Sequence, residues 1–152
     1  MLIFFFVTFI VMVISQAIGF EVNQRIQEYS SIRINEFIYF THIRNHGGIF
    51  GFLQGKGWLF AIFSTILLVA MAVYLWVSEQ ISRLEYIFFG LIAGGGASNV
   101  LDRLIYGSVI DFIDIQHIPF WNYIFNTADV CVHLGIWPLI FLSLRNGGDN
   151  RQ

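Results

Sequence analysis

Four long apolar runs divide the sequence, and they restrict the fold more than any other feature. The clearest run, Trp58 to Val77, carries no charged side chain and has the length of about 20 residues that a helix needs to cross a lipid bilayer. Charged residues make up only 12% of the chain, compared with about 25% in an average soluble domain. We therefore predict an all-α membrane protein, one domain over residues 1–152, whose helices cross the membrane at residues 2–20, 58–77, 85–105 and 127–145.

The other three runs are less regular. The first begins at residue 2 without the basic residues that precede the apolar segment of a cleaved signal peptide, so we expect it to remain as a helix. The third contains Gly90 and Gly94-Gly95-Gly96, which would let helices pack closely in lipid. The fourth, Val130 to Leu144, contains Pro138 and is short for a crossing, and the preceding residues 124–129 would complete it.

The two long loops, residues 21–57 and 106–128, would lie together on one side of the membrane, because each pair of crossings returns the chain to the side where it began. Residues 32–52 mix β-branched and aromatic side chains with Asn and Gly, so we expect a small β-rich subdomain on the membrane surface. A count of Lys and Arg would place these loops in the cytoplasm. That count is weak evidence if Arg44 and Arg103 are held in internal pairs.

Several kinds of site are excluded by composition. A net charge of −2 provides no basic surface for nucleic acid, so partners are expected in the membrane. Cys131 is the only cysteine and cannot form an internal disulfide or a cysteine metal site. The histidines do not have the spacing of metal ligands, so no metal site is predicted from His42, His46, His117 and His133.

Two aspartates lie where polar segments meet apolar runs, which is unusual because a carboxylate at the edge of a membrane is costly. Asp111 lies in the alternating segment Asp111-Phe112-Ile113-Asp114, which favours a solvated strand edge, and Asp129 precedes the fourth run, where it is placed to cap a helix. The connection between them is long enough to fold back. If the two carboxylates meet, they cannot both ionise, and one would serve as an acid and the other as a base.

Other polar side chains near the apolar runs have simpler interpretations. Asn99, Asp102 and Arg103 share one face of the third helix, where an Arg within hydrogen-bonding reach of Asp102 would lower the cost of burying both. The stretch Arg44-Asn45-His46-Gly47-Gly48 is typical of a turn, since Asn and Gly tolerate left-handed backbone. Taken separately, these motifs indicate structural roles.

Taken together and in order, the motifs resemble the bacterial lipoprotein signal peptidase (type II signal peptidase) family. They are Gly95-Gly-Ala-Ser-Asn99-Val-Leu-Asp102-Arg103, Gly107-Ser-Val-Ile-Asp111-Phe112 and Phe125-Asn126-Thr-Ala-Asp129. In addition, Arg44-Asn45-His-Gly47-Gly-Ile-Phe50-Gly51 is similar to the loop motif that precedes the second helix in that family. Ordered motifs of this kind in a chain with four spans are specific, and the resemblance covers residues 40–145.

The resemblance implies an intramembrane aspartyl endopeptidase that removes the signal peptide of a prolipoprotein on the N-terminal side of a diacylglyceryl-modified cysteine. Asp111 and Asp129 match the catalytic pair, and the positions that match site-shaping or substrate-binding residues are Asn45, Gly47, Asn99, Asp102, Arg103 and Asn126. We expect a monomer among the lipids of the bacterial cytoplasmic (inner) membrane, with both termini in the cytoplasm and the active site near the outer face, contrary to the charge count. No metal and no organic cofactor are implied.

One segment departs from the family pattern. Members usually carry an Asp-Gln pair followed by a Lys near the end of the first helix, whereas this chain has Ser15-Gln16-Ala-Ile-Gly19, which points to a divergent paralogue with altered efficiency or substrate choice. An alternative is a catalytically altered paralogue that binds lipopeptides or acts as a membrane scaffold, although two costly carboxylates argue against it. A small transporter with an acidic proton relay would carry acids within its spans, and the first two runs contain none.

Overall fold

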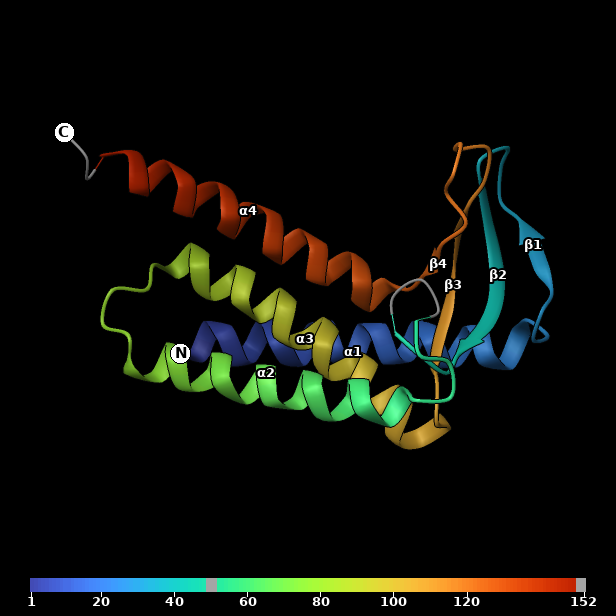
Figure 1. The fold of residues 1–152 in the computed structure, drawn as a ribbon, viewed down its shortest axis with the longest axis horizontal. Coiled ribbons are helices and arrows are strands. Elements are labelled where there is room, and N and C mark those ends of the chain that lie inside the picture. The colour runs from blue at the N-terminus through green and yellow to red at the C-terminus, as the bar shows by residue number, and fades with distance from the viewer. Residues whose placement is uncertain (49–51, 150–152) are drawn as a thin grey trace.

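The computed structural model describes residues 1–48 and 52–149, and within these residues the chain forms four helices and four strands (Figure 1). The helices are α1 (Leu2–Arg25), α2 (Gly57–Val77), α3 (Arg83–Tyr106) and α4 (Thr127–Asp149). The strands are β1 (Ser31–Arg33), β2 (Ile38–Asn45), β3 (Val109–Ile115) and β4 (Ile124–Phe125). All four helices are long and apolar enough to cross a membrane, which confirms the predicted fold class. The expected loop residues Ile49 to Gly51 lie outside the described residues.

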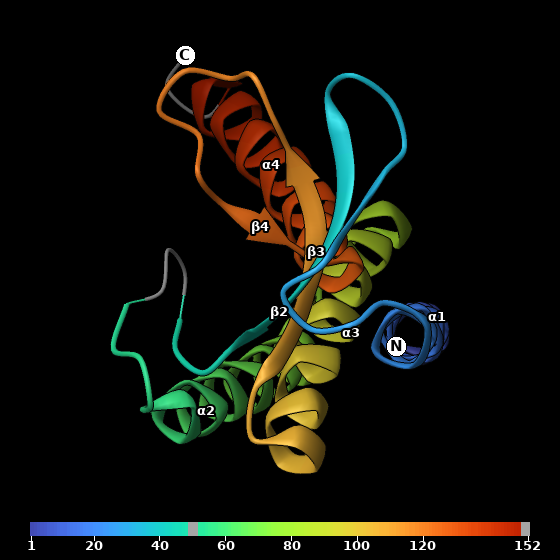
Figure 2. The same ribbon diagram turned by 90° about the vertical axis from the view of Figure 1, so that its right-hand side faces the viewer.

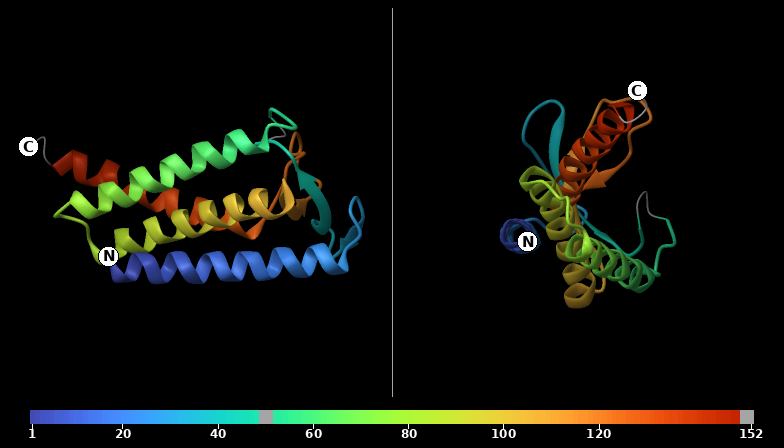
Figure 3. Two further views of the ribbon diagram at one scale, coloured as in Figure 1. Left: turned by 90° about the horizontal axis from the view of Figure 1, so that it is seen from below. Right: turned by 90° about the vertical axis from the view of Figure 1, so that its left-hand side faces the viewer.

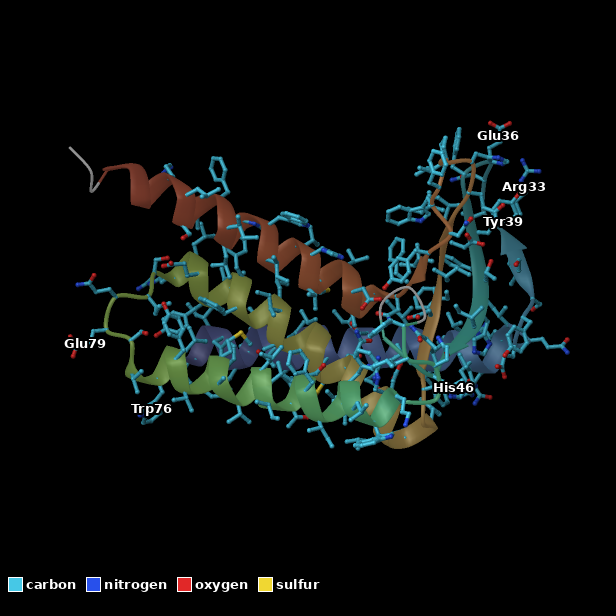
Figure 4. The ribbon with its side chains drawn as sticks, viewed as in Figure 1. Arg33, Glu36, Tyr39, His46, Trp76 and Glu79 are labelled. Carbon is cyan, nitrogen blue, oxygen red and sulfur yellow. The ribbon has the colours of Figure 1, made fainter. Side chains whose placement is uncertain are left out.

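Large apolar side chains cover the outer faces of the helices. Phe9 on α1, Ile66 on α2 and Phe141 on α4 are exposed by 58%, 59% and 66%. A monomeric soluble protein rarely exposes so much contiguous apolar surface, whereas lipid tails would cover it without cost. Among the labelled side chains of Figure 4, Glu79 lies at one end of the bundle and Glu36 at the opposite end, beside the strands. The apolar middle of the bundle is therefore the part that fits the membrane interior.

Helix α3 is the centre of the bundle and packs against α1, α2 and α4, which surround it in the end-on view (Figure 2). Its glycines allow the close approach that the sequence predicts. A Cβ atom on Gly94 would lie 2.6 Å from Cβ of Val11 on α1, and one on Gly95 would lie 2.3 Å from the carbonyl oxygen of Ala128 on α4. Because Cβ atoms do not approach other atoms this closely, a larger residue would push α1 or α4 away from α3.

The strands form one antiparallel sheet in the order β1-β2-β3-β4, which lies across one end of the bundle. The start of α1 and the end of α4 lie at the opposite end (Figures 1 and 3). The first long loop supplies β1 and β2, as expected, and the second supplies β3 and β4. The two loops therefore meet as neighbouring strands, with Ile43 of β2 opposite Asp111 of β3.

Strand β3 connects the sheet to the bundle. The chain leaves α3 through Gly107, whose φ of 70° is a left-handed conformation that glycine adopts without strain. Ile110 and Phe112 on β3 then pack against Val22 and Ile26 at the end of α1. The interpretation of Asp111 as a solvated strand edge is wrong, since β3 lies between β2 and β4 and Asp111 is only 1% exposed. An alternating pattern shows which residues share a face, but not what covers that face.

Candidate active site

Asp111 lies in the middle of β3 and is held there by two amide groups. Nδ2 of Asn45 on β2 donates a hydrogen bond of 3.0 Å to Oδ2 of Asp111, and Nδ2 of Asn126 donates one of 2.7 Å to Oδ1. Burial raises the pKa of Asp111, and the neighbouring negative charge of Asp129 raises it further, to about 7. Both amide hydrogen bonds and the charge of Arg103 oppose this rise in pKa. Asp111 is therefore able to hold a proton near neutral pH.

Asp129 lies in the first turn of α4, and Asn99 and Asn126 are among the residues that donate hydrogen bonds to its carboxylate. Nδ2 of Asn99 on α3 donates a hydrogen bond of 2.8 Å to Oδ1 of Asp129, and the backbone N–H of Asn126 donates one of 3.3 Å to Oδ2. In return, Oδ1 of Asn126 accepts a hydrogen bond of 3.0 Å from the backbone N–H of Asp129. This reciprocal arrangement is the capping box of a helix N-terminus, so the expected capping contact is present. It leaves the Asp129 carboxylate directed towards Asn99.

Asn126 joins the two aspartates. It contacts Asp111 through its side-chain amide and Asp129 through its backbone N–H, and its Nδ2 also donates a hydrogen bond of 3.1 Å to Oδ1 of Asn99. Like charges held this close cannot both be ionised at low cost. The structure thus brings together Asp111 and Asp129, which are eighteen residues apart in the sequence, with the amides that the motifs place beside them.

Arg103 and the turn before α2 form one wall of the site. Nη2 of Arg103 donates a hydrogen bond of 2.9 Å to the carbonyl oxygen of Gly47, and Nη1 donates one of 2.9 Å to the carbonyl oxygen of Asn99. The turn is stabilised by Asn45, whose Oδ1 accepts a hydrogen bond of 3.0 Å from the backbone N–H of Gly47. The expectation that Arg103 is paired with Asp102 is wrong, because Nη1 and Nη2 of Arg103 donate to these two carbonyl groups instead.

Asp102 is instead bound by α1 and β3. Nε2 of Gln16 donates a hydrogen bond of 2.7 Å to Oδ1 of Asp102, and the backbone N–H of Ile110 donates one of 3.1 Å to Oδ2. The amide of Gln16 also contacts Oγ of Ser98, at 3.0 Å. In the segment that departs from the family pattern, Ser15 is buried, and a Cβ on Gly19 would meet nothing within 4 Å. Asp102 therefore connects α1, α3 and β3.

Two cavities open beside the aspartates, and residues outside the sequence motifs line them together with the predicted ones. The first, of about 410 Å³, contains Asp129 and His133 among apolar and aromatic side chains. The second, of about 440 Å³, contains Asp111 and Asn45 together with Arg44 and Gln54. Trp121 and Tyr123 line both cavities. Their only sequence signal is proximity to Asn126, since they belong to none of the motifs.

Residues 1–48 and 52–149 contain no group of three His, Cys, Asp or Glu side chains placed to hold a metal ion. The chemistry available to the described site is that of two carboxylates, amides and one guanidinium group. A carboxylate that holds a proton beside one that accepts hydrogen bonds can carry out general acid and base catalysis, in which water attacks a polarised carbonyl group.

Comparison with known proteins gives consistent results. The sequence model of the family "Signal peptidase (SPase) II" matches residues 7–145. The lipoprotein signal peptidase of Syntrophomonas wolfei subsp. wolfei is 42% identical over 110 residues, which cover 72% of this chain and 70% of that protein. The lipoprotein signal peptidase of Alteromonas mediterranea is 33% identical over 148 residues, which cover 95% of this chain and 81% of that protein.

A solved structure supports the same conclusion. The structure of a bacterial membrane enzyme, determined by the in meso method at 2.3 Å resolution, superposes with a TM-score of 0.86 and 26% sequence identity. The match covers 98% of this chain and 91% of that chain. The fold therefore agrees over nearly all of the chain, including the sheet at the end of the bundle.

Proposed function

Because the chain belongs to the signal peptidase II family, and is thus a lipoprotein signal peptidase of the aspartic type, we propose that Asp111 and Asp129 are its catalytic pair. The enzyme is a membrane protein that removes signal peptides from prolipoproteins. The observation that carries the assignment of the pair is the contact of Asn126 with both carboxylates. Asn45, Gly47, Asn99, Arg103 and Asn126 shape the site around them.

Asp102 is the other buried carboxylate, and a pair made of Asp102 and Asp111 is the competing assignment. We favour Asp129 because both oxygens of Asp102 accept hydrogen bonds from groups outside the site, namely Gln16 and the backbone of Ile110. Asp129 also lines a cavity, whereas Asp102 lines neither of the two cavities beside the aspartates. A catalytic carboxylate must reach water and substrate.

The proposed reaction uses water as the nucleophile. Asp129, in its ionised form, removes a proton from the water molecule as the water oxygen bonds to the carbonyl carbon of the scissile peptide. Asp111, in its protonated form, donates its proton to the carbonyl oxygen. The tetrahedral intermediate then collapses as the C–N bond breaks, Asp129 passes its proton to the leaving amine, and Asp111 recovers a proton from a hydroxyl of the intermediate. No covalent acyl-enzyme forms.

We propose that cleavage occurs on the N-terminal side of a diacylglyceryl-modified cysteine, in a monomer, and that substrate enters from the lipid. The apolar cavity beside Asp129 supports this, because it opens on the helical, lipid-facing part of α4 and is lined by Leu134, Trp137 and Pro138. Such a wall suits an apolar signal peptide and a lipid tail. Membrane lipids are thus expected neighbours of the site.

For the orientation, we propose that the sheet and the catalytic pair face the outer side of the bacterial cytoplasmic membrane and that both termini lie in the cytoplasm. The sheet lies at the end of the bundle opposite the start of α1 and the end of α4, so the site and the termini would lie on opposite sides of a membrane (Figure 1). The count of Lys and Arg favours the reverse orientation. Reporter fusions to the C-terminus that are active in the cytoplasm would support our proposal, and fusions active only outside would reject it.

The catalytic pair is tested by cleavage of a diacylglyceryl-modified prolipoprotein, followed by gel shift with the purified protein. We expect Asp111→Asn and Asp129→Asn to reduce cleavage by about a thousandfold or more, because each removes one of the two proton transfers. The matched control is Asp114→Asn, on the same strand as Asp111, where Asp114 accepts hydrogen bonds from Thr41 and Gln116. Full cleavage by Asp129→Asn together with loss in Asp102→Asn would favour the competing pair.

The same assay separates the enzyme from a protein that only binds lipopeptides. A binding protein would retain the lipidated substrate without shortening it, and its Asp→Asn variants would behave like the wild type. A shortened product in the wild type and an intact substrate in the two Asp→Asn variants would reject binding alone.

A further inference from the structure

Tyr123 lies between the two cavities of the site and belongs to none of the motifs. It immediately precedes β4, which is fixed by pairing of Ile124 with Asp114 on β3. Its ring stacks on Phe125 with centroids 6.0 Å apart and an interplanar angle of 19°. The ring of Trp121 makes a T-shaped contact with it, with centroids 6.2 Å apart. The ring is therefore held in one orientation, at the boundary between the cavity of Asp111 and the cavity of Asp129.

The hydroxyl group of Tyr123 donates a hydrogen bond to the Asp129 carboxylate. Burial raises the pKa of Tyr123 far above its usual range, and the negative charges of Asp129 and Asp111 raise it further. The phenol therefore keeps its proton at every pH at which the enzyme would work, so it remains able to donate this hydrogen bond. Together with Nδ2 of Asn99 and the backbone N–H of Asn126, it is a third donor to Asp129.

Asp111 has a different set of contacts. It accepts hydrogen bonds from the amides of Asn45 and Asn126, and its exposed fraction is 1%. Donors to a carboxylate stabilise the ionised form, and burial disfavours it. Asp129 has more donors, which favours its ionised form, and Asp111 is more deeply buried, which favours its protonated form.

We propose that Tyr123 is a positioning residue that holds Asp129 ionised and correctly oriented, so that Asp129 acts as the base while Asp111 keeps the shared proton as the acid. This inference rests on the proposed function. Charged and titratable groups around Asp129 come from three elements: Arg103 on α3, Asp111 on β3 and His133 on α4. Tyr123→Phe leaves Arg103 and His133 in the sequence, so a change in pH dependence can be assigned to the Tyr123 hydroxyl.

The test is Tyr123→Phe, which removes the hydroxyl and retains the ring that packs against Phe125 and Trp121. We expect kcat for cleavage of a diacylglyceryl-modified prolipoprotein to fall by about tenfold to a hundredfold, the usual effect of losing a hydrogen bond to a charged group. KM should stay within about twofold of the wild-type value, because the lost hydrogen bond is made to Asp129 and not to the substrate. The acidic limb of the pH profile should move to higher pH by about one unit, and the alkaline limb should stay in place.

The control is Tyr29→Phe, since Tyr29 is 77% exposed and lines neither of the two cavities beside the aspartates. Replacement of Tyr123 by 3-fluorotyrosine, whose phenol is a stronger donor, should move the acidic limb in the opposite direction. An unshifted acidic limb in Tyr123→Phe, with active wild-type enzyme, would overturn this inference alone. If the wild type does not cleave the substrate, the proposed function fails and this inference fails with it.

Discussion

The side-chain amide of Asn126 donates a hydrogen bond of 2.7 Å to Asp111 on β3, while its carbonyl oxygen accepts one of 3.0 Å from the backbone N–H of Asp129 on α4. One side chain thus caps a helix and connects the proposed catalytic carboxylates. The two tasks use different atoms of the same amide group. Substitutions that keep the acceptor and remove the donor can therefore separate them.

We predict that Asn126→Ser retains the stability of the helix terminus and loses activity. Ser is about as good an N-cap as Asn, but its short side chain does not supply the amide donor to Asp111 and Asn99. Cleavage should fall by about tenfold or more, while the midpoint of thermal unfolding in detergent stays close to that of the wild type. Asn126→Ala should show the same loss of activity and, in addition, a loss of about 1 kcal/mol in the free energy of unfolding. Equal stability of the Ser and Ala variants would contradict the capping role.

A second prediction concerns the close contact between α3 and α4 at Gly95. In Gly95→Ala the new Cβ would lie 2.3 Å from the carbonyl oxygen of Ala128, so α4 must move away and carry Asp129 with it. Because Asn99 of α3 binds Asp129 at 2.8 Å, this movement should lengthen a hydrogen bond of the site. We expect both a lower midpoint of thermal unfolding and a loss of cleavage by about tenfold or more, since small misplacements of catalytic groups are costly.

Gly19→Ala is the matched control for that substitution. A Cβ on Gly19 of α1 would have no neighbour within 4 Å, and alanine is the better helix former by about 1 kcal/mol. The control should therefore be as stable as the wild type or more so, with normal cleavage. If both variants behaved alike, close packing at Gly95 would not be what positions Asp129.

The sequence predicts the four membrane helices, because an uncharged apolar run of sufficient length has few other ways to satisfy its backbone. It also places Asn99, Asp111, Asn126 and Asp129 in one site, but only through the family motifs. Spacing alone favours a cap for Asp129 and a solvated position for Asp111. The helix terminus is capped, but the capping side chain is that of Asn126, and Asp129 is its partner in the capping box. Asp111 is not solvated, since Asn126 and Asn45 cover it.

Contacts between distant segments are what the sequence leaves open. The partner of Asp102 is Gln16, which precedes it by eighty-six residues, and not the adjacent Arg103. Helical periodicity indicates which side chains share a face of α3, but not which helix packs on that face. The close approach at Gly90 and Gly94 shows that this helix is α1. Tyr123 reaches Asp129 because β4 pairs with β3, and none of the sequence motifs predicts this pairing.

A third prediction follows from the contact between Gln16 and Asp102. Gln16→Leu keeps the size of the side chain and removes the amide that donates to Oδ1 of Asp102 at 2.7 Å. The free energy of unfolding should fall by about 1–3 kcal/mol, because a buried carboxylate oxygen loses its donor. If the hydrogen bond to Asp102 causes this loss, Gln16→Leu should lower the free energy of unfolding less in an Asp102→Asn background than in the wild type. Additive effects of the two substitutions, measured by thermal unfolding in detergent, would contradict a direct interaction.

The last prediction concerns stability and pH. Burial, with the charge of Asp129, raises the pKa of Asp111 from an ordinary value of 3.8 to about 7 in the folded protein. Below pH 3.8 both the folded and the unfolded chain hold this proton, but at higher pH the unfolded chain releases it first, so Asp111 costs stability progressively between about pH 4 and pH 7. Asp111→Asn removes this pH-dependent loss of stability. The new amide also changes the stability, but by an amount that does not depend on pH. The unfolding midpoint of the variant relative to the wild type should therefore increase from about pH 4 to pH 7 and stay level above pH 7. Asp114→Asn, on the same strand, serves as the reference for an Asp→Asn substitution outside the proposed catalytic pair. A constant difference between Asp111→Asn and the wild type across this range would mean that Asp111 is already ionised in the folded protein, and the acid role would pass to another group.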